Sequence, residues 1–384
     1  MAKVLIRGPL LSQSGYGVHS RQVFKWLLKS GHDITCQILP WGITPWYLKP
    51  EALDGLIGEI MNRSSAPQVP FDVSFQVQLP DEWDISLAKK NVGITAAVET
   101  NFCNPDWITA CNKMDGVIVP SDFTKGVLEN SGKITKLLKV IPESYPENFA
   151  DDRKQEKFLK VKSKNNFLLF GQLTAPEPDL DRKNTVNAIK WFCEKFANRK
   201  DVGLIIKTNM GTNSTIDKRI SINSLKQVIR HVRKTKFPRI TLLHGNMNTG
   251  ELFKLYNDKN IIGLISATRG EGYGLPMIEA AAAGLPVMAT DWSGHKTFLQ
   301  DGHWLPIQYS IKEIHPQRVD NRIFMKESMW ADVDEMDFKS GLEKFLKQKK
   351  NYREKAISQR KIILEKFSQE AIEKMYDDFM KEMI

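Results

Sequence analysis

The chain has 384 residues, of which 41% are hydrophobic and 26% are charged, and its formal net charge is +10. This length suggests two domains, and the composition is that of a globular protein with ample apolar material for large cores. Disordered, collagen-like and coiled-coil proteins are therefore excluded as the main content of the chain.

The positive charge is concentrated in one part of the chain. Residues 161–240 hold 17 Lys and Arg but 6 Asp and Glu, whereas the segments before and after are close to neutral. An anionic partner larger than a small ligand, such as a nucleic acid, is expected to contact this stretch. A solvated face that keeps the protein in solution explains the same charge.

The first 150 residues alternate strand-like apolar segments with helix-like amphipathic ones. Strands are predicted at 4–6, 33–39, 73–79, 92–98 and 116–120, and helices at 18–29, 106–113 and 122–130. Alternation of this kind predicts a parallel, doubly wound sheet. The charged segment 147–166 interrupts the pattern and is interpreted as an interdomain linker.

The alternation resumes in the second half. Strands are predicted at 167–170, 202–207, 240–244, 261–266 and 286–289, and helices at 184–196, 218–239, 249–256, 276–283 and over most of 342–383. Residues 303–335 show no clear period. The expected fold class is thus α/β, with two Rossmann-like doubly wound domains.

Neither a membrane span nor an export signal is predicted. No apolar run approaches the roughly 18–20 residues that cross a bilayer. The beginning of the chain, Lys3-Val4-Leu5-Ile6-Arg7, has the pattern of a first strand and not of a secretory leader. Four scattered cysteines without metal-type spacing indicate reduced thiols, so we expect a cytoplasmic protein.

The most informative segment runs from Ser266 to Ala289. A buried strand leads into a loop with three glycines between 270 and 274, and Pro276 stands where a first helical turn tolerates a missing N–H. Such a strand, loop and helix form an anion site at the carboxyl edge of a sheet. Glu279 in the helix can accept hydrogen bonds from two vicinal hydroxyls, and Glu271 can reach the ligand from the loop.

Here the sequence resembles the nucleotide-sugar-dependent retaining glycosyltransferases of family four (group 1). Their signature of two glutamates separated by seven residues is matched between Gly270 and Val287, with Tyr273 in place of the usual Phe. The segments Val117–Lys125 and Leu169–Thr174 resemble further family segments.

The resemblance implies the GT-B fold, in which two Rossmann-like domains face each other across a cleft. Residues 1–155 would form the acceptor-side domain and residues 156–361 the donor-binding domain. A final helix, about 362–384, would cross back onto the first domain.

The resemblance also implies roles for individual residues. Glu279 would hold the donor ribose, and Glu271 would contact the sugar and diphosphate. The backbone of the glycine loop would contact the same groups through Gly272, Tyr273, Gly274 and Leu275.

Two cations are expected against the diphosphate. The family's usual Arg position reads Gln172 in this chain, so Lys183, with Arg182 as the substitute Arg, would supply the charges. A departing nucleoside diphosphate builds negative charge that fixed cations stabilise. An exposed pair of loop cations is the alternative.

Two features of the first domain complete the expected site. The loop Gly15-Tyr16-Gly17 enters a helix and, by the resemblance, closes over the donor phosphates. Glu99, placed at the end of the strand 92–98, stands where many relatives carry a His that touches the donor sugar. The alternative for the Gly15–Gly17 loop is a simple turn. The alternative for Glu99 is a loop acid that caps the following turn.

The sequence therefore predicts an enzyme that transfers a hexosyl or related sugar from a nucleotide-diphosphate donor to a hydroxyl of a glycan, a lipid or another acceptor, with retained anomeric configuration. No metal or other cofactor is expected, because cations take the metal's place, and Asp179 and Asp181 are interpreted as loop residues. The alternatives are a glycosyltransferase acting on modified bases of DNA, through the basic stretch 161–240, and a non-catalytic nucleotide-sugar-binding protein.

Overall fold

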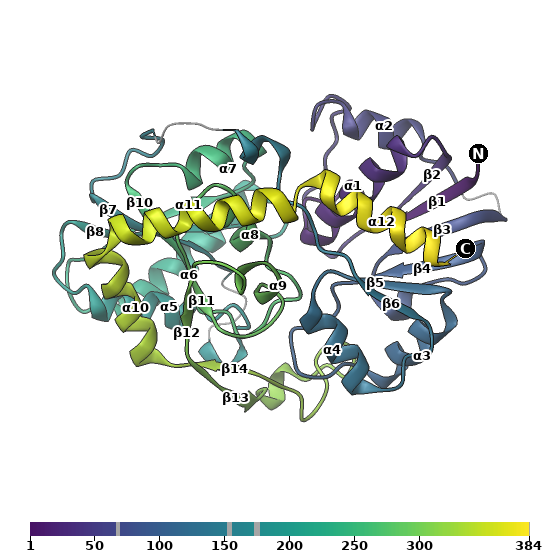
Figure 1. The fold of residues 1–384 in the computed structure, drawn as a ribbon. Helices are drawn as coiled ribbons and strands as arrows, with labels where there is room; N and C mark the ends of the chain where they lie inside the picture. The colour runs from purple at the N-terminus through teal and green to yellow at the C-terminus, as the bar shows by residue number, and fades with distance from the viewer. Residues whose placement is uncertain (67–69, 152–155, 173–176, 384) are drawn as a thin grey trace. The chain divides into compact units, whose positions relative to one another are not determined.

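The computed structural model describes residues 1–66, 70–151, 156–172 and 177–383. The chain forms two compact units, each with its own parallel sheet (Figure 1). Unit 1 comprises Met1–Ser144, Asn321–Met325 and Gln369–Ile384, and unit 2 comprises Tyr145–Asp320 and Lys326–Ser368.

Unit 1 is built on a six-stranded sheet in the order β2-β1-β3-β4-β5-β6, with every pair parallel. Its strands are β1 Lys3–Gly8, β2 Asp33–Ile38, β3 Phe71–Val77, β4 Ala88–Ile94, β5 Gly116–Val119 and β6 Leu137–Val140. Its helices are α1 Gly15–Lys29, α2 Leu56–Asn62, α3 Pro105–Lys113, α4 Asp122–Ser131 and α12 Gln369–Met383, with a 3-10 turn at Pro80–Glu82.

Side-chain caps fix where the helices of unit 1 begin. The Ser121 side chain accepts a hydrogen bond from the N–H of Thr124 at the start of α4, and Asn104 caps α3 in the same manner. The last helix, α12, packs on α1, where the ring of Tyr376 stacks on Trp26 at 4.9 Å. Unit 1 is thus completed by the end of the chain.

Unit 2 has a second six-stranded parallel sheet, in the order β12-β11-β10-β7-β8-β9. Its strands are β7 Asn165–Phe170, β8 Val202–Thr208, β9 Arg239–His244, β10 Ile261–Ser266, β11 Val287–Thr290 and β12 Leu305–Ile307, and an antiparallel pair is formed by β13 Tyr309–Glu313 and β14 Met329–Val333. Its helices are α5 Thr185–Lys195, α6 Thr215–Val232, α7 Thr249–Tyr256, α8 Leu275–Ala282, α9 Lys296–Leu299, α10 Glu335–Lys347 and α11 Lys349–Lys366, with 3-10 turns at Glu147–Ala150, Pro178–Leu180 and Pro316–Arg318.

The two parallel sheets confirm the predicted fold class of two Rossmann-like domains. The buried strands Val202–Thr208 and Ile261–Ser266 are apolar along nearly their whole length, as expected where helices cover both faces of a sheet. Within the described residues, no helix is both long and apolar enough to span a membrane.

The unit boundaries differ from those predicted. The first unit ends at Ser144 and not at 155, because Phe149 of the segment interpreted as a linker is fully buried in the core of unit 2. The residue at the predicted boundary, Gln155, lies outside the described residues, as do Leu173 and Thr174 of the family-like segment 169–174. The chain returns to unit 1 at Gln369 and not at 362, since α11 still packs on α8 in unit 2.

Two predicted elements also need correction, and one segment without a prediction is now described. β4 ends at Ile94, so Glu99 follows the strand by a loop and does not lie at its end. The basic helix predicted at 218–239 is α6, which ends at Val232 because Pro238 and the start of β9 follow. Residues 303–335, which have no clear period, form short strands and turns that sequence periodicity does not detect.

Candidate active site

Three neighbouring strands of unit 2 end at the same edge of its sheet. β10, β7 and β8 are parallel and adjacent in that order, so the loops after Ser266, Phe170 and Thr208 leave the sheet side by side. Open α/β sheets bind ligands at this carboxyl edge. The first loop carries Glu271, and the second carries the pair 182–183.

The loop after β10 becomes α8 through a glycine turn. Gly274 precedes the helix with a left-handed φ of 107°, and a Cβ there would lie 2.8 Å from Cε of Met277. Pro276 occupies the first turn, where a missing N–H is tolerated. The helix therefore starts at this edge, where its first N–H groups and its dipole favour an anion.

Glu271 is held by both predicted cations. Nζ of Lys183 lies 2.6 and 2.8 Å from the two carboxylate oxygens of Glu271. Nη1 of Arg182 lies 3.4 Å from Oε2 and donates a hydrogen bond of 2.6 Å to the carbonyl oxygen of Gly270. Although burial raises it, the attraction of Lys183 and then Arg182 lowers the pKa of Glu271 to about 2. Glu271 is therefore a buried, ionised carboxylate between two cations.

The backbone around the cations is fixed by Asp181. This fully buried carboxylate accepts hydrogen bonds from the N–H groups of Lys183, at 3.0 Å, and Thr185, at 2.6 Å. The carbonyl oxygen of Arg182 accepts a hydrogen bond from the N–H of Arg269, which ties the loop to the end of β10. Asp181 thus holds the start of α5, and the side chains of 182 and 183 take their direction from it.

Asp179 and Asp181 each have partners of their own in the structure. Asp179 faces Arg269, with 3.6 Å between Oδ1 and Nη2. Across the residues that the structure describes, no group of three or more His, Cys, Asp or Glu is arranged to hold a metal ion.

Glu279 lies on α8 and has a different environment. Its Oε2 accepts a hydrogen bond of 2.9 Å from the hydroxyl of Tyr256. Burial raises the pKa of Glu279 to about 7, against the effects of the Tyr256 hydrogen bond and the charge of Lys207. Burial also lowers the pKa of Lys207 to about 8, against the attraction of Glu279. The site thus contains a second acid that changes its charge near neutral pH.

The predicted glycine loop of unit 1 is the first turn of α1. The side chain of Ser14 accepts a hydrogen bond of 3.1 Å from the N–H of Gly17. A Cβ on Gly17 would lie 2.0 Å from the carbonyl oxygen of Ser12, so this glycine is required by the local fold itself. Gly15, the first residue of the helix, is exposed.

Tyr16 points into unit 1. Its hydroxyl shares a hydrogen bond of 3.0 Å with Thr95 and accepts one of 3.1 Å from the N–H of Ala96. Its ring stacks on Trp41, with ring centroids 3.9 Å apart. Burial and, to a smaller extent, the nearby charge of Glu99 raise the pKa of Tyr16. The side chain of Tyr16 therefore positions the loop that carries Glu99, and the contact of the 15–17 loop with the donor stays a prediction.

The side chain of Tyr273, in the glycine loop before α8, is buried in unit 2. It is only 3% exposed and packs in the core of this unit, where its ring meets that of Phe298 edge-on at 5.0 Å. Only the backbone of this residue can serve a ligand, together with that of Gly272, Gly274 and Leu275.

The matched sequence family covers this constellation. Residues 153–323 match the family described as glycosyl transferases group 1, a range that contains Arg182, Lys183, Glu271 and Glu279. This part of the chain is thus similar to the glycosyl transferases group 1.

Individual proteins resemble this chain to different extents. A sucrose synthase from Denitrovibrio acetiphilus is 26% identical over 42% of this chain and 23% of its own length. The serotype-specific mannosyltransferase WbdA from Escherichia coli is 29% identical over 42% of this chain and 18% of its own length. The chain thus spans about a fifth of these curated relatives. The crystal structure of Anabaena HepE in complex with UDP and glucose matches over the full length of both chains, with a TM-score of 0.64 and 13% identity, which shows a shared GT-B fold.

Two residues near Glu279 were not predicted from the sequence. Lys207 is a cation inside the otherwise apolar strand β8, and it donates hydrogen bonds of 2.9 Å to Oδ1 of Asn209 and 2.6 Å to the carbonyl oxygen of Gly245. A lysine within an apolar strand is the sequence signal that could have identified Lys207 as a functional residue. Tyr256 carries no such sequence signal, because an aromatic residue at the end of an amphipathic helix usually packs in the hydrophobic core.

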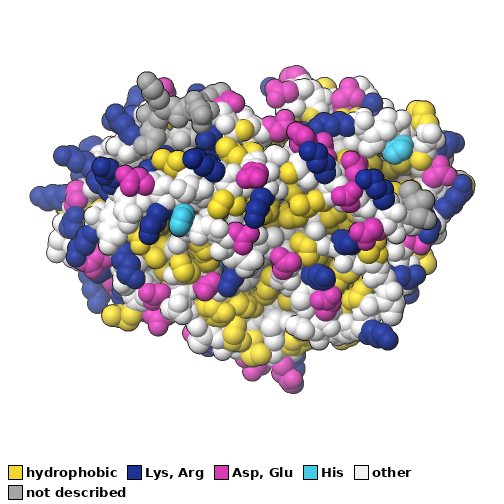
Figure 2. All heavy atoms as spheres, in the orientation of Figure 1, with side chains coloured by type: hydrophobic (Ala, Val, Ile, Leu, Met, Phe, Trp, Pro, Cys, Tyr) yellow, Lys and Arg dark blue, Asp and Glu magenta, His cyan; other side chains and the backbone are white. Residues whose placement is uncertain are grey.

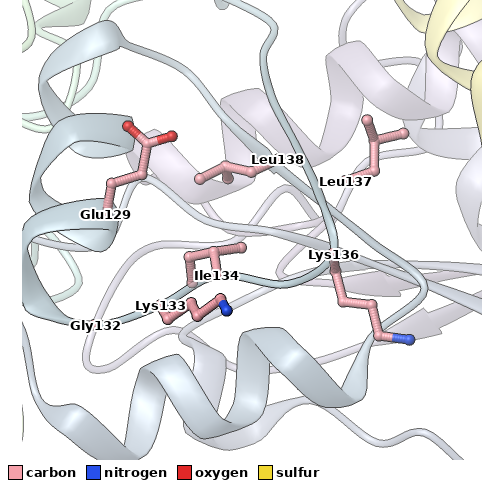
Figure 3. Close-up of a pocket in the computed structure, with 7 residues that line it drawn as sticks. All are labelled: Glu129, Gly132, Lys133, Ile134, Lys136, Leu137 and Leu138. Carbon is pink, nitrogen blue, oxygen red and sulfur yellow. The ribbon is translucent and has the colours of Figure 1, made fainter.

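A cavity of about 330 Å³ lies in unit 1, away from all of these residues. Figure 3 shows it between the end of α4 and the chain leading into β6. Charges of both signs line it, from Glu129, Lys133 and Lys136. It adds nothing to the site described above.

Proposed function

We propose that the protein is a retaining glycosyltransferase that moves a hexosyl or related sugar from a nucleotide-diphosphate donor to an acceptor hydroxyl. The observation that carries the proposal is the cluster of Lys183, Arg182 and Glu271 beside the start of α8 in unit 2. The family match of the same segment supports it.

The two cations would act on the leaving group. When the bond between the sugar's anomeric carbon and the phosphate oxygen breaks, the electron pair stays with the nucleoside diphosphate. Lys183 and Arg182 are already oriented by Glu271 and Asp181, so they need no reorganisation to stabilise this charge. The start of α8 supplies N–H groups for the same phosphates.

Glu271 is poorly suited to take a proton. A carboxylate whose pKa is lowered to about 2 by two cations is a weak base near neutral pH. The departing phosphate oxygen can accept the acceptor's proton instead, on the face where the new bond to the anomeric carbon forms. Attack on the face that the phosphate leaves retains the anomeric configuration, and Glu271 contributes by positioning.

Glu279 would hold the donor's ribose. An ionised carboxylate accepts from two vicinal hydroxyls, and Tyr256 orients one of its oxygens from the protein side. The carboxylate lies half-buried on α8, close enough to Lys207 of β8 for that charge to lower its pKa. This placement suits a group that contacts the nucleoside and not the reacting carbon.

The donor sugar is proposed to be a hexose. HepE was crystallised with UDP and glucose, and the two curated relatives are named as a sucrose synthase and a mannosyltransferase. Unit 1 would serve the acceptor, which is a glycan, a lipid or another hydroxyl compound, and Gly15 and Glu99 stay predicted contacts of the donor. We also propose that no metal is needed, since the cations stand where a metal would otherwise neutralise the diphosphate.

A donor panel tests the proposal. Nucleotide hexoses, beginning with UDP-glucose, are screened by thermal shift, and nucleoside diphosphate release is then measured for each donor that stabilises the protein. We expect at least one donor to stabilise the wild type and to be turned over, and Lys183→Ala to lose turnover. A donor that binds without release under any acceptor tested would make this a nucleotide-sugar-binding protein.

A further inference from the structure

A second charged feature of unit 2 lies at the opposite edge of its sheet. A cavity of about 320 Å³ is lined by the segment 160–163, just before β7, and by the segment 233–241, which leads from α6 into β9. Strand starts and strand ends lie on opposite edges of a parallel sheet, about 20 Å apart for six residues. The cavity is therefore separate from the cluster around Glu271.

Cations dominate the wall of this cavity. Five of its nine lining residues are Lys or Arg, and none is Asp or Glu: Lys160, Lys162, Arg233, Lys236 and Arg239. The sequence has no Asp or Glu from 157 to 176 or from 218 to 250, so both lining segments come from acid-free stretches. Figure 2 shows Lys and Arg side chains gathered on the side of unit 2 where Figure 1 labels β7 and β8.

These cations lack the counter-charges that other cations of unit 2 have. Within the described part of the chain, none of the five forms an ion pair with a carboxylate, whereas the nearby Arg199 pairs with Asp201 at 2.8 Å. Two of the guanidinium groups are held by other contacts. Nη1 of Arg233 donates a hydrogen bond of 3.1 Å to the carbonyl oxygen of Pro238. The guanidinium of Arg239 lies 5.2 Å from the ring centre of Phe237.

Such an arrangement favours an anion. Like charges around one concavity repel each other, and surfaces that serve solubility alone usually mix both signs. We propose that this basic cavity is a binding site for a compact ligand with two or more neighbouring phosphates. Arginine forks and lysine ammonium groups are the side chains that bind phosphate oxygens.

The size and chemistry of the cavity set the ligand class. Its volume suits a small ligand, since ligand sites span about 300–1,000 Å³. No aromatic side chain is among the lining residues, whereas single-stranded nucleic acids are held by base stacking on such rings. A phosphate chain free in solution and the phosphorylated headgroup of a lipid share the required chemistry.

Calorimetric titration with tripolyphosphate tests the site. The charge-reversed variant Lys162→Glu/Arg239→Glu is compared with Lys226→Glu/Lys254→Glu, which makes the same charge change at exposed residues outside the cavity. We expect the first variant to weaken binding at least tenfold and the second by about twofold or less, from long-range charge alone. Lys183→Ala, which removes a cation of the other edge, should keep the binding.

Three results would overturn the proposal. The first is equal weakening in both reversed variants, which would mean unspecific attraction. The second is loss of binding in Lys183→Ala alone, which would place the phosphates at the donor site. The third is duplex DNA binding that depends on Lys162 and Arg239 while tripolyphosphate does not compete, which would assign the surface to a polymer. Thermal melting of each variant checks that it is folded.

A second experiment distinguishes a lipid headgroup from a soluble ligand as the source of the phosphates. Vesicles of phosphatidylcholine with or without phosphatidylinositol bisphosphate are sedimented with the protein. Sedimentation that needs the bisphosphate, Lys162 and Arg239 supports a lipid headgroup, whereas tripolyphosphate binding without sedimentation supports a soluble ligand. Binding in neither arm would contradict the site.

Discussion

Two glutamates of unit 2, Glu271 and Glu279, lie eight residues apart and have opposite electrostatic environments. Glu271 meets Lys183 and Arg182 directly, and their charges lower its pKa to about 2 even though burial acts in the other direction. For Glu279, burial prevails and the pKa rises to about 7, because a phenol and a more distant lysine compensate less.

The contrast shows how one sequence motif can separate two tasks. A carboxylate paired with two cations stays ionised near neutral pH. The two cations beside it can therefore act on the leaving group with a charge that does not change with pH. A carboxylate with a neutral partner keeps accepting capacity for a ligand's hydroxyls, and its charge depends on pH. We therefore propose that the region of Glu271 serves the chemical step and the region of Glu279 serves donor binding.

The largest effect is expected for Lys183→Ala. A fixed charge is worth more to the departing diphosphate than to the intact donor, so kcat should fall by about 10²-fold or more. Steady-state kinetics with the donor found in the panel provide the measurement, and Lys226→Ala on the exposed side of α6 is the control. A rise in acceptor KM with unchanged kcat would instead place Lys183 in acceptor recognition.

Glu279→Ala should come next and should act on binding. Loss of hydrogen bonds to a charged group is expected to weaken donor affinity by about 1.5–3 kcal/mol, a roughly 10- to 150-fold rise in Kd. The hydroxyl of Tyr256 keeps the carbonyl oxygen of Pro276 as an acceptor at 3.3 Å, so the variant should fold. Unchanged donor affinity in calorimetry would remove Glu279 from the site.

A smaller effect is expected from pH. The pKa of about 7 for Glu279 lies above the ordinary 4.5, so its carboxylate is lost as pH falls through 7. Lys207, whose pKa is about 8, becomes more charged over the same range and supports ionisation. Donor Kd should rise by about tenfold or less from pH 8 to 6.

Two variants sharpen this pH dependence. The donor affinity of Glu279→Gln should be nearly independent of pH. In Tyr256→Phe, loss of the hydrogen bond that lowers the pKa of Glu279 should move the profile to higher pH. A wild-type profile that persists in Glu279→Gln would assign the titration to another group.

No effect is expected from metal removal. Turnover should be the same within error with or without EDTA, because Lys183 and Arg182 supply the positive charge. Loss of turnover in EDTA that Mn²⁺ or Mg²⁺ restores would reverse the assignment and return Asp179 and Asp181 to the site.

The sequence predicts the fold class, and two cations and a glutamate that it singles out lie together in the structure. Alternating strands and helices mark both sheets, and the glycines and Pro276 mark the start of α8 because their backbone requirements are local. Sequence cannot show that Glu271 pairs with Lys183, since that contact joins loops from two different strands.

The side-chain contacts of three further residues join positions that are remote in sequence. Tyr16 stands between two glycines, yet its hydroxyl bonds to Thr95, which is 79 positions away. Tyr273 looks like a loop residue but packs on Phe298 in the core. Lys207 belongs to a strand whose pattern is apolar. The acceptors of its two hydrogen bonds, on Asn209 and Gly245, come close to it only in the folded sheet.

Parallel measurement of donor Kd and kcat in Glu271→Gln and Glu279→Gln tests the central assignment most directly. The account predicts that Glu271→Gln lowers kcat by about tenfold or more while Kd stays within about threefold. The substitution removes the carboxylate charge that orients Lys183 and Arg182, but both cations keep their own positive charge. For Glu279→Gln it predicts a Kd about tenfold higher, with kcat at saturating donor within about threefold of the wild type. If both variants change the same parameter, or if the two effects are exchanged, the division of tasks between the glutamates is wrong.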